Sequence, residues 1–301
     1  MPEPRYAILP ARGVLELSGE ESRSFLQALI TRDMDHLTPR AAIYSALLTP
    51  QGKYLFDFFL ADAGDRLLLD GEAARLADLA QRLNMYRLRA KVAIADVSAD
   101  RQVIAAFGDG AAAALGLAGT AGAARPFADG LAFVDPRLAE AGARLIAPAA
   151  TAAAALEAAG LSQTEAEDYD LFRLDLALPD GSRDLAVDKA LLLESNFEAL
   201  NGVDFDKGCF VGQELTARTK YRGLVRKRLL PVRVDGPMPA PDTPLLADGK
   251  EVGVMRSGRD GRGLALLRLE RLADGGAGPL TGGQATLTPI RPDWADFDLP
   301  A

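Results

Sequence analysis

The order of the expected helices and strands changes near residue 228, and this change limits the folds open to the chain. Before it, apolar stretches typical of strands, such as residues 43–49 and 54–60, alternate irregularly with helix-type spacing. After it, short strand-like segments follow one another, separated by Gly, Pro and Asp, as in a small barrel. We therefore expect an α+β domain over residues 1–228 and a small antiparallel β-barrel domain over residues 229–301.

Polar residues are expected to start three helices of the first domain. Two Ser-x-x-Glu capping boxes begin at Ser18 and Ser162, and Asp70 lies just before a further helical spacing. Residues 108–160 are rich in Ala and Gly, but strand-like runs interrupt them, so we expect small helices in a packed lobe rather than a linker.

The chain has one cysteine, Cys209, and one histidine, His36, among its 301 residues. A disulfide needs two cysteines, and a structural zinc site or an iron-sulfur cluster takes about four protein ligands. The sequence therefore predicts no disulfide and no metal site built by this chain alone, and His36 is expected to be a surface or packing residue.

The net charge of −8 argues against direct nucleic-acid binding, which depends on Lys and Arg at phosphates. No apolar run approaches the roughly 20 residues of a membrane span, and residues 1–6 do not resemble a presequence. We expect no membrane partner and a cytoplasmic location.

Cys209 lies between a lysine and two glycines, in the segment Lys207-Gly208-Cys209-Phe210-Val211-Gly212. The Lys207 ammonium would favour the thiolate, and the glycines would let the backbone turn tightly or approach a ligand closely. A lone cysteine is also a small residue suited to burial in a core. The residues alone leave both interpretations open.

Residues 207–214, KGCFVGQE, with Ala217-Arg218, closely resemble the signature of the YgfZ family of folate-binding proteins. This family is a branch of the glycine-cleavage T-protein (aminomethyltransferase) superfamily. Further stretches match in order: residues 25–33, 48–58, 86–92, 173–179, Glu194 and 253–254. The resemblance implies two α+β lobes around a central pocket for tetrahydrofolate or a derivative, followed by the C-terminal barrel.

The resemblance also implies the residues of that pocket. Asp175, with Arg173 in Arg-Leu-Asp, takes the place of a carboxylate that accepts the donor pair of a pterin. Asp57 matches an aspartate that T-proteins use at the one-carbon unit of folate, where it would act as the acid-base group. On its apolar strand, Asp57 could instead lie at a sheet edge and bond to backbone.

Five further residues complete the predicted site. Glu194 matches an acidic residue of the pocket, Lys207 would act by its charge on Cys209 or on a ligand, and Gln213 and Glu214 open a helix where capping is an alternative role. Arg218 begins a basic cluster, residues 218–228, which would hold an anion such as the glutamate tail of folate, or contact a partner. The predicted catalytic residues are Cys209, Lys207 and Asp57.

Members of the resembled family are implicated in maturing or repairing iron-sulfur enzymes, including radical enzymes that modify tRNA. The resemblance therefore implies a tetrahydrofolate-binding accessory factor that contacts iron-sulfur proteins or their assembly factors. The alternatives are a folate-dependent aminomethyl or one-carbon transferase, and a binding module that has lost its cofactor. Whether the chain is an enzyme stays open.

Overall fold

The computed structural model describes residues 3–223, 225–274 and 279–297. The chain divides into two compact units, each built from three segments that are not consecutive in the sequence. The first unit comprises residues 1–48, 55–169 and 200–211, and the second comprises 49–54, 170–199 and 212–301. The sequence predicts one domain boundary, near residue 228. The segments of the two compact units alternate along the chain.

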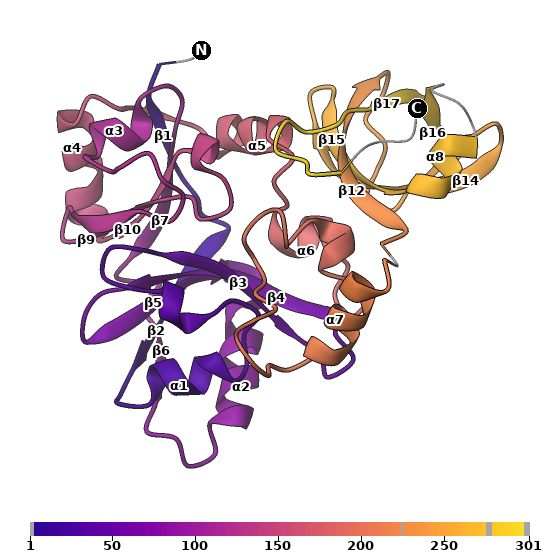
Figure 1. Cartoon of the computed structure of the whole chain (residues 1–301). Coiled ribbons are helices and arrows are strands. Elements are labelled where there is room, and N and C mark those ends of the chain that lie inside the picture. Colours follow the sequence, from indigo (N-terminus) through magenta and orange to yellow (C-terminus); the bar gives the residue numbers. More distant parts are fainter. Residues whose placement is uncertain (1–2, 224, 275–278, 298–301) are drawn as a thin grey trace. The chain divides into compact units, whose positions relative to one another are not determined.

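A five-stranded sheet forms the first half of the first unit, with strand order β3-β4-β5-β2-β6 (Figure 1). Its strands are β2 (Arg12–Ser18), β3 (Ile43–Leu48), β4 (Tyr54–Asp62), β5 (Arg66–Glu72) and β6 (Ala93–Asp96). Helices α1 (Ser22–Gln27) and α2 (Leu76–Arg87) pack apolar side chains such as Phe25, Leu26 and Leu79 against one face. The strands predicted at residues 43–49 and 54–60 are confirmed as β3 and β4.

A six-stranded sheet forms the other half, with strand order β11-β1-β7-β10-β9-β8. Its strands are β1 (Arg5–Ile8), β7 (Gln102–Phe107), β8 (Ala124–Phe127), β9 (Gly130–Val134), β10 (Ala143–Ala147) and β11 (Ser162–Thr164). The short helices α3 (Ala111–Ala114) and α4 (Ala149–Ala158) cover it with small side chains. The Ala-rich region is thus a packed lobe, as expected.

Buried ion pairs and aromatic rings connect these two sheets. The Asp70 carboxylate, on β5, is fully buried and pairs with Arg12 at 2.6 Å and with Arg144, on β10, at 2.8 Å. Aromatic rings also connect the sheets: the Phe59 ring, on β4, lies 6.4 Å from the Phe133 ring, on β9, centroid to centroid. A carboxylate removed from water is tolerated here because each oxygen has a cationic partner.

The predicted helix caps are wrong. Asp70 is a strand residue, and a 3-10 turn, η2 (Ala73–Arg75), separates β5 from α2. Ser162 lies in β11, and helix α5 (Ala166–Asp175) begins after it, while α1 starts at Ser22 with no side-chain cap. Strand pairing and burial of apolar side chains outweigh the capping preference at these sites.

The C-terminal part of the second unit is a closed barrel with strand order β12-β15-β14-β13-β16-β17. Its strands are β12 (Lys227–Asp235), β13 (Pro244–Ala247), β14 (Lys250–Arg259), β15 (Arg262–Arg268), β16 (Leu280–Gly282) and β17 (Ala285–Pro289), with helix α8 (Leu269–Asp274) after β15. Leu, Val and Met side chains fill the interior. The predicted barrel is confirmed.

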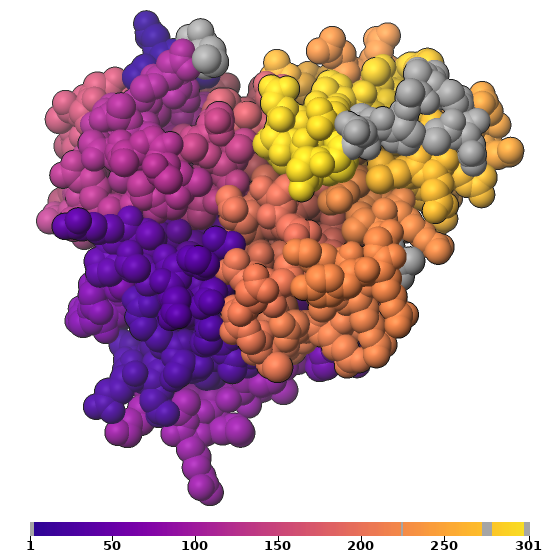
Figure 2. All heavy atoms as spheres, viewed as in Figure 1, coloured from indigo at the N-terminus to yellow at the C-terminus, as the bar shows by residue number. Residues whose placement is uncertain are grey.

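Short elements complete the description. They are the helices α6 (Gly181–Asp184) and α7 (Gln213–Tyr221) and the 3-10 turns η1 (Met34–His36), η3 (Ala139–Ala141) and η4 (Leu193–Ser195). The connection from α2 to β6 projects at the foot of Figure 2 and carries Leu88, which is 88% exposed. Among the helices of the described residues, none is long and apolar enough to cross a membrane.

Candidate functional site: an exposed thiol on an anchored loop

Cys209 is exposed, on a loop of the first unit that precedes α7. Its neighbours hold the loop to the body: Phe210 is 7% exposed, and Val211 packs against the core under the five-stranded sheet. The interpretation of Cys209 as a buried core residue is therefore wrong, and the thiol is open to solvent or to a partner.

Lys207 anchors this loop. Its Nζ donates hydrogen bonds to the carbonyl oxygens of Ile30 at 2.6 Å and Arg32 at 2.9 Å, and it lies 5.4 Å from the centre of the Phe210 ring. Burial lowers the pKa of Lys207 to about 8, while the negative charges of nearby aspartates oppose that shift. Because the ammonium is bound to backbone oxygens, its evident task is to position the loop, two residues before the thiol.

Thr31 and Asp204 make a second attachment. The Thr31 hydroxyl donates to the Gly202 carbonyl at 2.6 Å, and the Asp204 amide donates to the Thr31 carbonyl at 2.9 Å. The Asp204 carboxylate accepts from Arg32 Nη1 at 2.7 Å and from the Asp33 amide at 2.8 Å. Loop residues 202–207 are thus bound to residues 30–33.

Sequence reasoning did not assign roles to Thr31, Arg32 or Asp204. A signal was present, because residues 29–33 and the segment around Cys209 both belong to the stretches that carry the family resemblance. The contact joins segments about 170 residues apart, which no local pattern can reveal.

Asp57 is buried inside the first unit. Strand β4 lies between β3 and β5, so the interpretation of Asp57 as a sheet-edge residue is wrong. Its Oδ2 accepts a hydrogen bond from the Tyr44 hydroxyl at 2.9 Å. Burial, together with the negative charge of Asp57, raises the pKa of Tyr44 well above its ordinary value, so Tyr44 is a stable proton donor.

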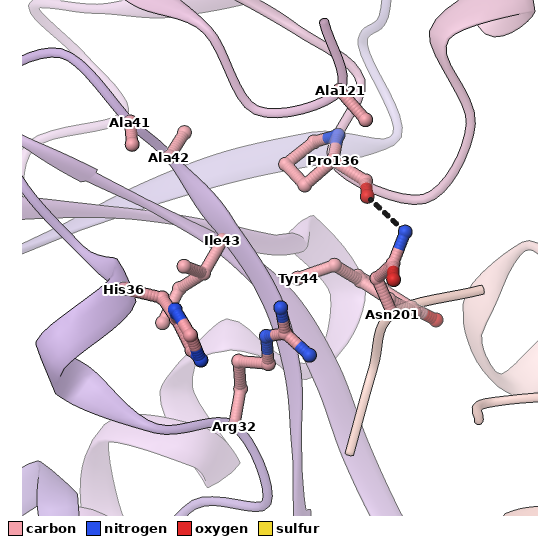
Figure 3. Close-up of a pocket in the computed structure, with 9 residues that line it drawn as sticks. All are labelled: Arg32, His36, Ala41, Ala42, Ile43, Tyr44, Ala121, Pro136 and Asn201. Carbon is pink, nitrogen blue, oxygen red and sulfur yellow. Dashed lines mark hydrogen bonds between the residues drawn. The ribbon is translucent and has the colours of Figure 1, made fainter. Parts of the chain in front are cut away.

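A pocket of about 240 Å³ opens beside the start of the Cys209 loop (Figure 3). Arg32, His36, Tyr44 and Asn201 supply its polar groups, and Asn201 donates a hydrogen bond to the Pro136 carbonyl at 3.2 Å. Because Tyr44 also binds Asp57, it connects this pocket with the predicted acid-base residue.

Arg173 lies in the second unit, where it joins α5 to α6 and the barrel. The guanidinium binds Asp170 at 2.8 Å, Asp184 at 2.6 Å and the Ser257 hydroxyl at 2.7 Å, and only 3% of the residue is exposed. Asp184 also accepts from the Ser257 amide and hydroxyl. With these partners Arg173 holds the unit together, and its predicted contact with a cofactor stays a prediction.

Asp175, at the end of α5, lines a pocket of about 180 Å³ against the barrel. Arg233, Arg262 and Arg291 also line it, and Arg262 pairs with the Asp175 carboxylate at 2.8 Å. Burial raises the pKa of Asp175, while Arg262 and Arg233 oppose the rise. A half-exposed carboxylate among arginines suits a polar ligand that carries both donors and negative charge.

The remaining predicted residues also belong to the second unit. Glu194 is half-buried in η4, and burial raises its pKa against the opposing charges of Lys227 and Lys53. Gln213 and Glu214 form the first turn of α7, as predicted, and the residue at the cap is Gly212, which has no side chain to cap the helix. Glu214 pairs with Arg218 at 2.7 Å along the exposed helix surface, a contact of small energy.

Two matched stretches meet at Gly212. Gly52, in the turn between β3 and β4, has a φ of +68°, and a Cβ there would lie 2.9 Å from the Gly212 carbonyl oxygen. Only glycine fits this turn without strain, which explains why position 52 of the matched stretch 48–58 is a glycine.

The described residues contain no group of three or more His, Cys, Asp or Glu side chains able to hold a metal ion. The exposed Cys209 thiol is thus the one cysteine sulfur that the chain offers. Such a group can supply one bond to a cluster whose other ligands come from elsewhere.

The fold has a known counterpart. The glycine cleavage system aminomethyltransferase T from Bartonella henselae aligns with a TM-score of 0.77 at 16% identity, covering 96% of this chain and 85% of that one. The family model of the CAF17 C-terminal beta-barrel domain matches residues 226–297. The chain thus has a T-protein-like fold of mixed α/β content with a closed C-terminal barrel, and the predicted fold class is confirmed.

Closer relatives carry a more specific name. The human mitochondrial iron-sulfur cluster assembly factor IBA57 is 34% identical over 315 residues, which cover 95% of this chain and 84% of the human protein. The mouse protein of that name is 32% identical with the same coverage. The Mycosarcoma maydis homologue is 33% identical, but the match covers 57% of its length. The chain belongs to the IBA57 family of iron-sulfur cluster assembly factors.

These names correct one prediction. A cytoplasmic location was expected from the sequence, but the human, mouse and fungal relatives are all named mitochondrial. The relatives therefore point to the mitochondrion instead. The composition of residues 1–6 was too weak a basis for the prediction.

Proposed function

We propose that this chain assists the assembly of iron-sulfur clusters by offering the Cys209 thiolate as one ligand to a cluster held mainly by a partner protein. The observation that carries the proposal is the exposure of Cys209 on a loop that is otherwise firmly attached. The relatives of the chain are named as iron-sulfur cluster assembly factors, which supports the same role.

The need for a partner follows from ligand number. A cluster takes about four protein ligands, whereas the sequence has one cysteine. The partner would supply the remaining thiolates, and Cys209 would lose its proton to solvent when it binds iron. A bond through a single ligand is also easily exchanged, as cluster delivery requires.

Loop anchoring lowers the cost of that encounter. Lys207, Thr31 and Asp204 fix the backbone beside the thiol before any partner arrives, so little conformational entropy is lost on binding. Phe210, buried next to the thiol, is a further attachment of the loop.

The test is complementation in cells that lack the native protein, with the activity of an iron-sulfur enzyme as the readout. We expect Cys209→Ser to abolish rescue at unchanged protein abundance, because the serine hydroxyl is a poor ligand for iron. Asp206→Asn, a change at an exposed residue of the same loop, should rescue fully. Full rescue by Cys209→Ser would refute the proposal.

A narrower version of the proposal specifies which iron-sulfur enzymes depend on the chain. Under a YgfZ-type role, the chain would serve radical enzymes that modify tRNA, as the motif around Cys209 suggests. Measurement of cluster-dependent tRNA modifications in the same deletion strain checks this. Normal modification alongside loss of other iron-sulfur activities would exclude it.

Tetrahydrofolate is proposed as the ligand of the Asp175 pocket. The carboxylate could accept the donor pair of the pterin, and Arg233 and Arg262 suit the anionic tail. Calorimetry should detect binding that Asp175→Ala removes and that Asp260→Ala, an exposed change on the same unit, leaves intact. No binding at millimolar ligand would refute it.

The transferase alternative is not favoured, because the relatives of the chain are named assembly factors rather than aminomethyltransferases. Folate-dependent transfer would not need the thiol. Turnover of an aminomethyl donor that survives Cys209→Ser would be required to revive it.

A further inference from the structure

We propose that the pocket between Arg32, His36 and Asn201 is a binding site for a small oxyanion, either a phosphorylated or a carboxylated molecule. All of its lining residues belong to the first unit. Figure 3 shows the Arg32 guanidinium in the middle of the lining, with the His36 ring on one side and the Asn201 amide on the other. Arg32 and His36 thus bring two types of hydrogen-bond donor to the cavity from residues 32–36, while the Asn201 amide, which donates to the Pro136 and Arg137 carbonyls, lines it from another segment.

The charge of the lining supports an anion. Arg32 and His36 are its ionisable cationic groups, and none of the nine residues that the structure describes as lining the pocket is acidic. This contrasts with the chain as a whole, whose net charge is −8. Arg32 is paired with Asp204, which does not line the pocket, so the lining itself has a positive side chain and no negative one, and this would attract an anion.

Asp204 fixes the orientation of the guanidinium. Its Oδ1 accepts from Arg32 Nη1 at 2.7 Å, and its Oδ2 lies 3.7 Å from His36 Nε2, which is too long for a hydrogen bond. This bond uses one terminal nitrogen of Arg32, which leaves Nη2 and Nε for a ligand. Bidentate recognition of carboxylate or phosphate depends on such a fixed arginine.

The size of the pocket limits the ligand. A volume of about 240 Å³ equals the space of about eight water molecules, at roughly 30 Å³ each. Phosphate, a small phosphate ester or a di- or tricarboxylate fits this space.

Site-specific measurement is possible because His36 is the only histidine of the chain. Its ring signals in a proton NMR spectrum should shift when inorganic phosphate or citrate is added to the wild type. Calorimetry with the same two probes measures affinity, and the tighter of the two identifies the preferred oxyanion.

The matched variants are Arg32→Gln and Arg40→Gln, since Arg40 is exposed nearby and does not line the pocket. We expect Arg32→Gln to weaken binding at least about tenfold and Arg40→Gln to leave it unchanged. His36→Ala, at a residue with few contacts, guards against loss of folding in Arg32→Gln and should weaken binding several-fold.

Three results would overturn the proposal. One is the absence of heat and of NMR shifts up to roughly 20 mM of either probe, where any specific site of useful affinity would be filled. The second is equal weakening by Arg32→Gln and Arg40→Gln, which indicates only general attraction. The third is competition of tetrahydrofolate with phosphate and citrate, which would make the pocket part of a cofactor site. None of these depends on cluster assembly, so the proposed function can fail separately.

Discussion

Replacement of Asp204 by Ala should loosen the Cys209 loop by an amount that the structure allows us to calculate. The variant loses the Arg32 ion pair and leaves the Asp33 amide without its carboxylate acceptor. Both partners of the ion pair are 20% exposed, so we take the low end for a charged hydrogen bond, about 1.5 kcal/mol. The amide bond adds about 0.5 kcal/mol, since solvent can partly replace it. The total is about 2 kcal/mol, or roughly 30-fold in the opening equilibrium.

Hydrogen exchange measures this opening directly. The Asp204 amide, which donates to the Thr31 carbonyl at 2.9 Å, should exchange roughly 30-fold faster in Asp204→Ala if closing remains fast. Strand amides of the five-stranded sheet should keep their protection, because the Thr31 hydroxyl and Lys207 still hold the loop in part.

Asp206→Ala is the control, because Asp206 is exposed on the same loop. Its exchange pattern should match that of the wild type. The reasoning fails if Asp204→Ala changes loop exchange by less than about threefold, or if Asp206→Ala has an equal effect. Either result would mean that the carboxylate of Asp204 does not fix the loop.

Three further predictions concern buried polar groups. Asp184→Ala should destabilise the second unit by about 3–5 kcal/mol in chemical unfolding, because it leaves buried Arg173 short of a partner. The control is Asp180→Ala, which removes a more exposed ion pair with Arg183 and should cost less than about 1 kcal/mol. Burial alone would raise the pKa of Asp170, but its arginine partners lower it well below the ordinary value. Its stabilising effect is therefore complete above about pH 4 and is lost as the pH falls towards the folded-state pKa, so Asp170→Asn should flatten the acid limb of a stability-pH curve. The Tyr44 phenol should stay protonated at the ordinary tyrosine pKa of 10.0, so that wild type and Tyr44→Phe release equal numbers of phenolic protons up to that pH in a spectrophotometric titration.

The fold could be predicted where local pattern and burial agree. The strand β4 and its neighbours follow from alternating or continuous apolar residues, and the barrel follows from short strands with Gly and Pro between them. The predicted start of a helix was wrong where the expected capping residue has another role. Asp70 resembles a cap in the sequence but is a fully buried strand residue that binds two arginines. Local preferences of about 1 kcal/mol yield to such tertiary contacts.

The candidate site was predicted only in part, for a physical reason. Cys209 could be selected because its residue type and glycine neighbours are visible in one short segment. The partners of Lys207 could not, because a lysine bound to two backbone carbonyls leaves no sequence pattern. Arg173 shows a different limit: its motif position predicts a ligand contact, but nothing in the sequence reveals the buried ion pairs that it makes with Asp170 and Asp184.

The contrast between a firmly held loop and an exposed thiol is itself informative. A cysteine needed only for packing would gain from burial, and a cysteine of no importance would not need its loop attached by Lys207, Thr31 and Asp204. Under the proposed function, exposure would keep Cys209 open to exchange of iron ligands, and attachment would spare a partner from ordering the loop on binding. A single ligand on a rigid support would then orient a shared cluster, yet bind it too weakly to keep it once the partner leaves.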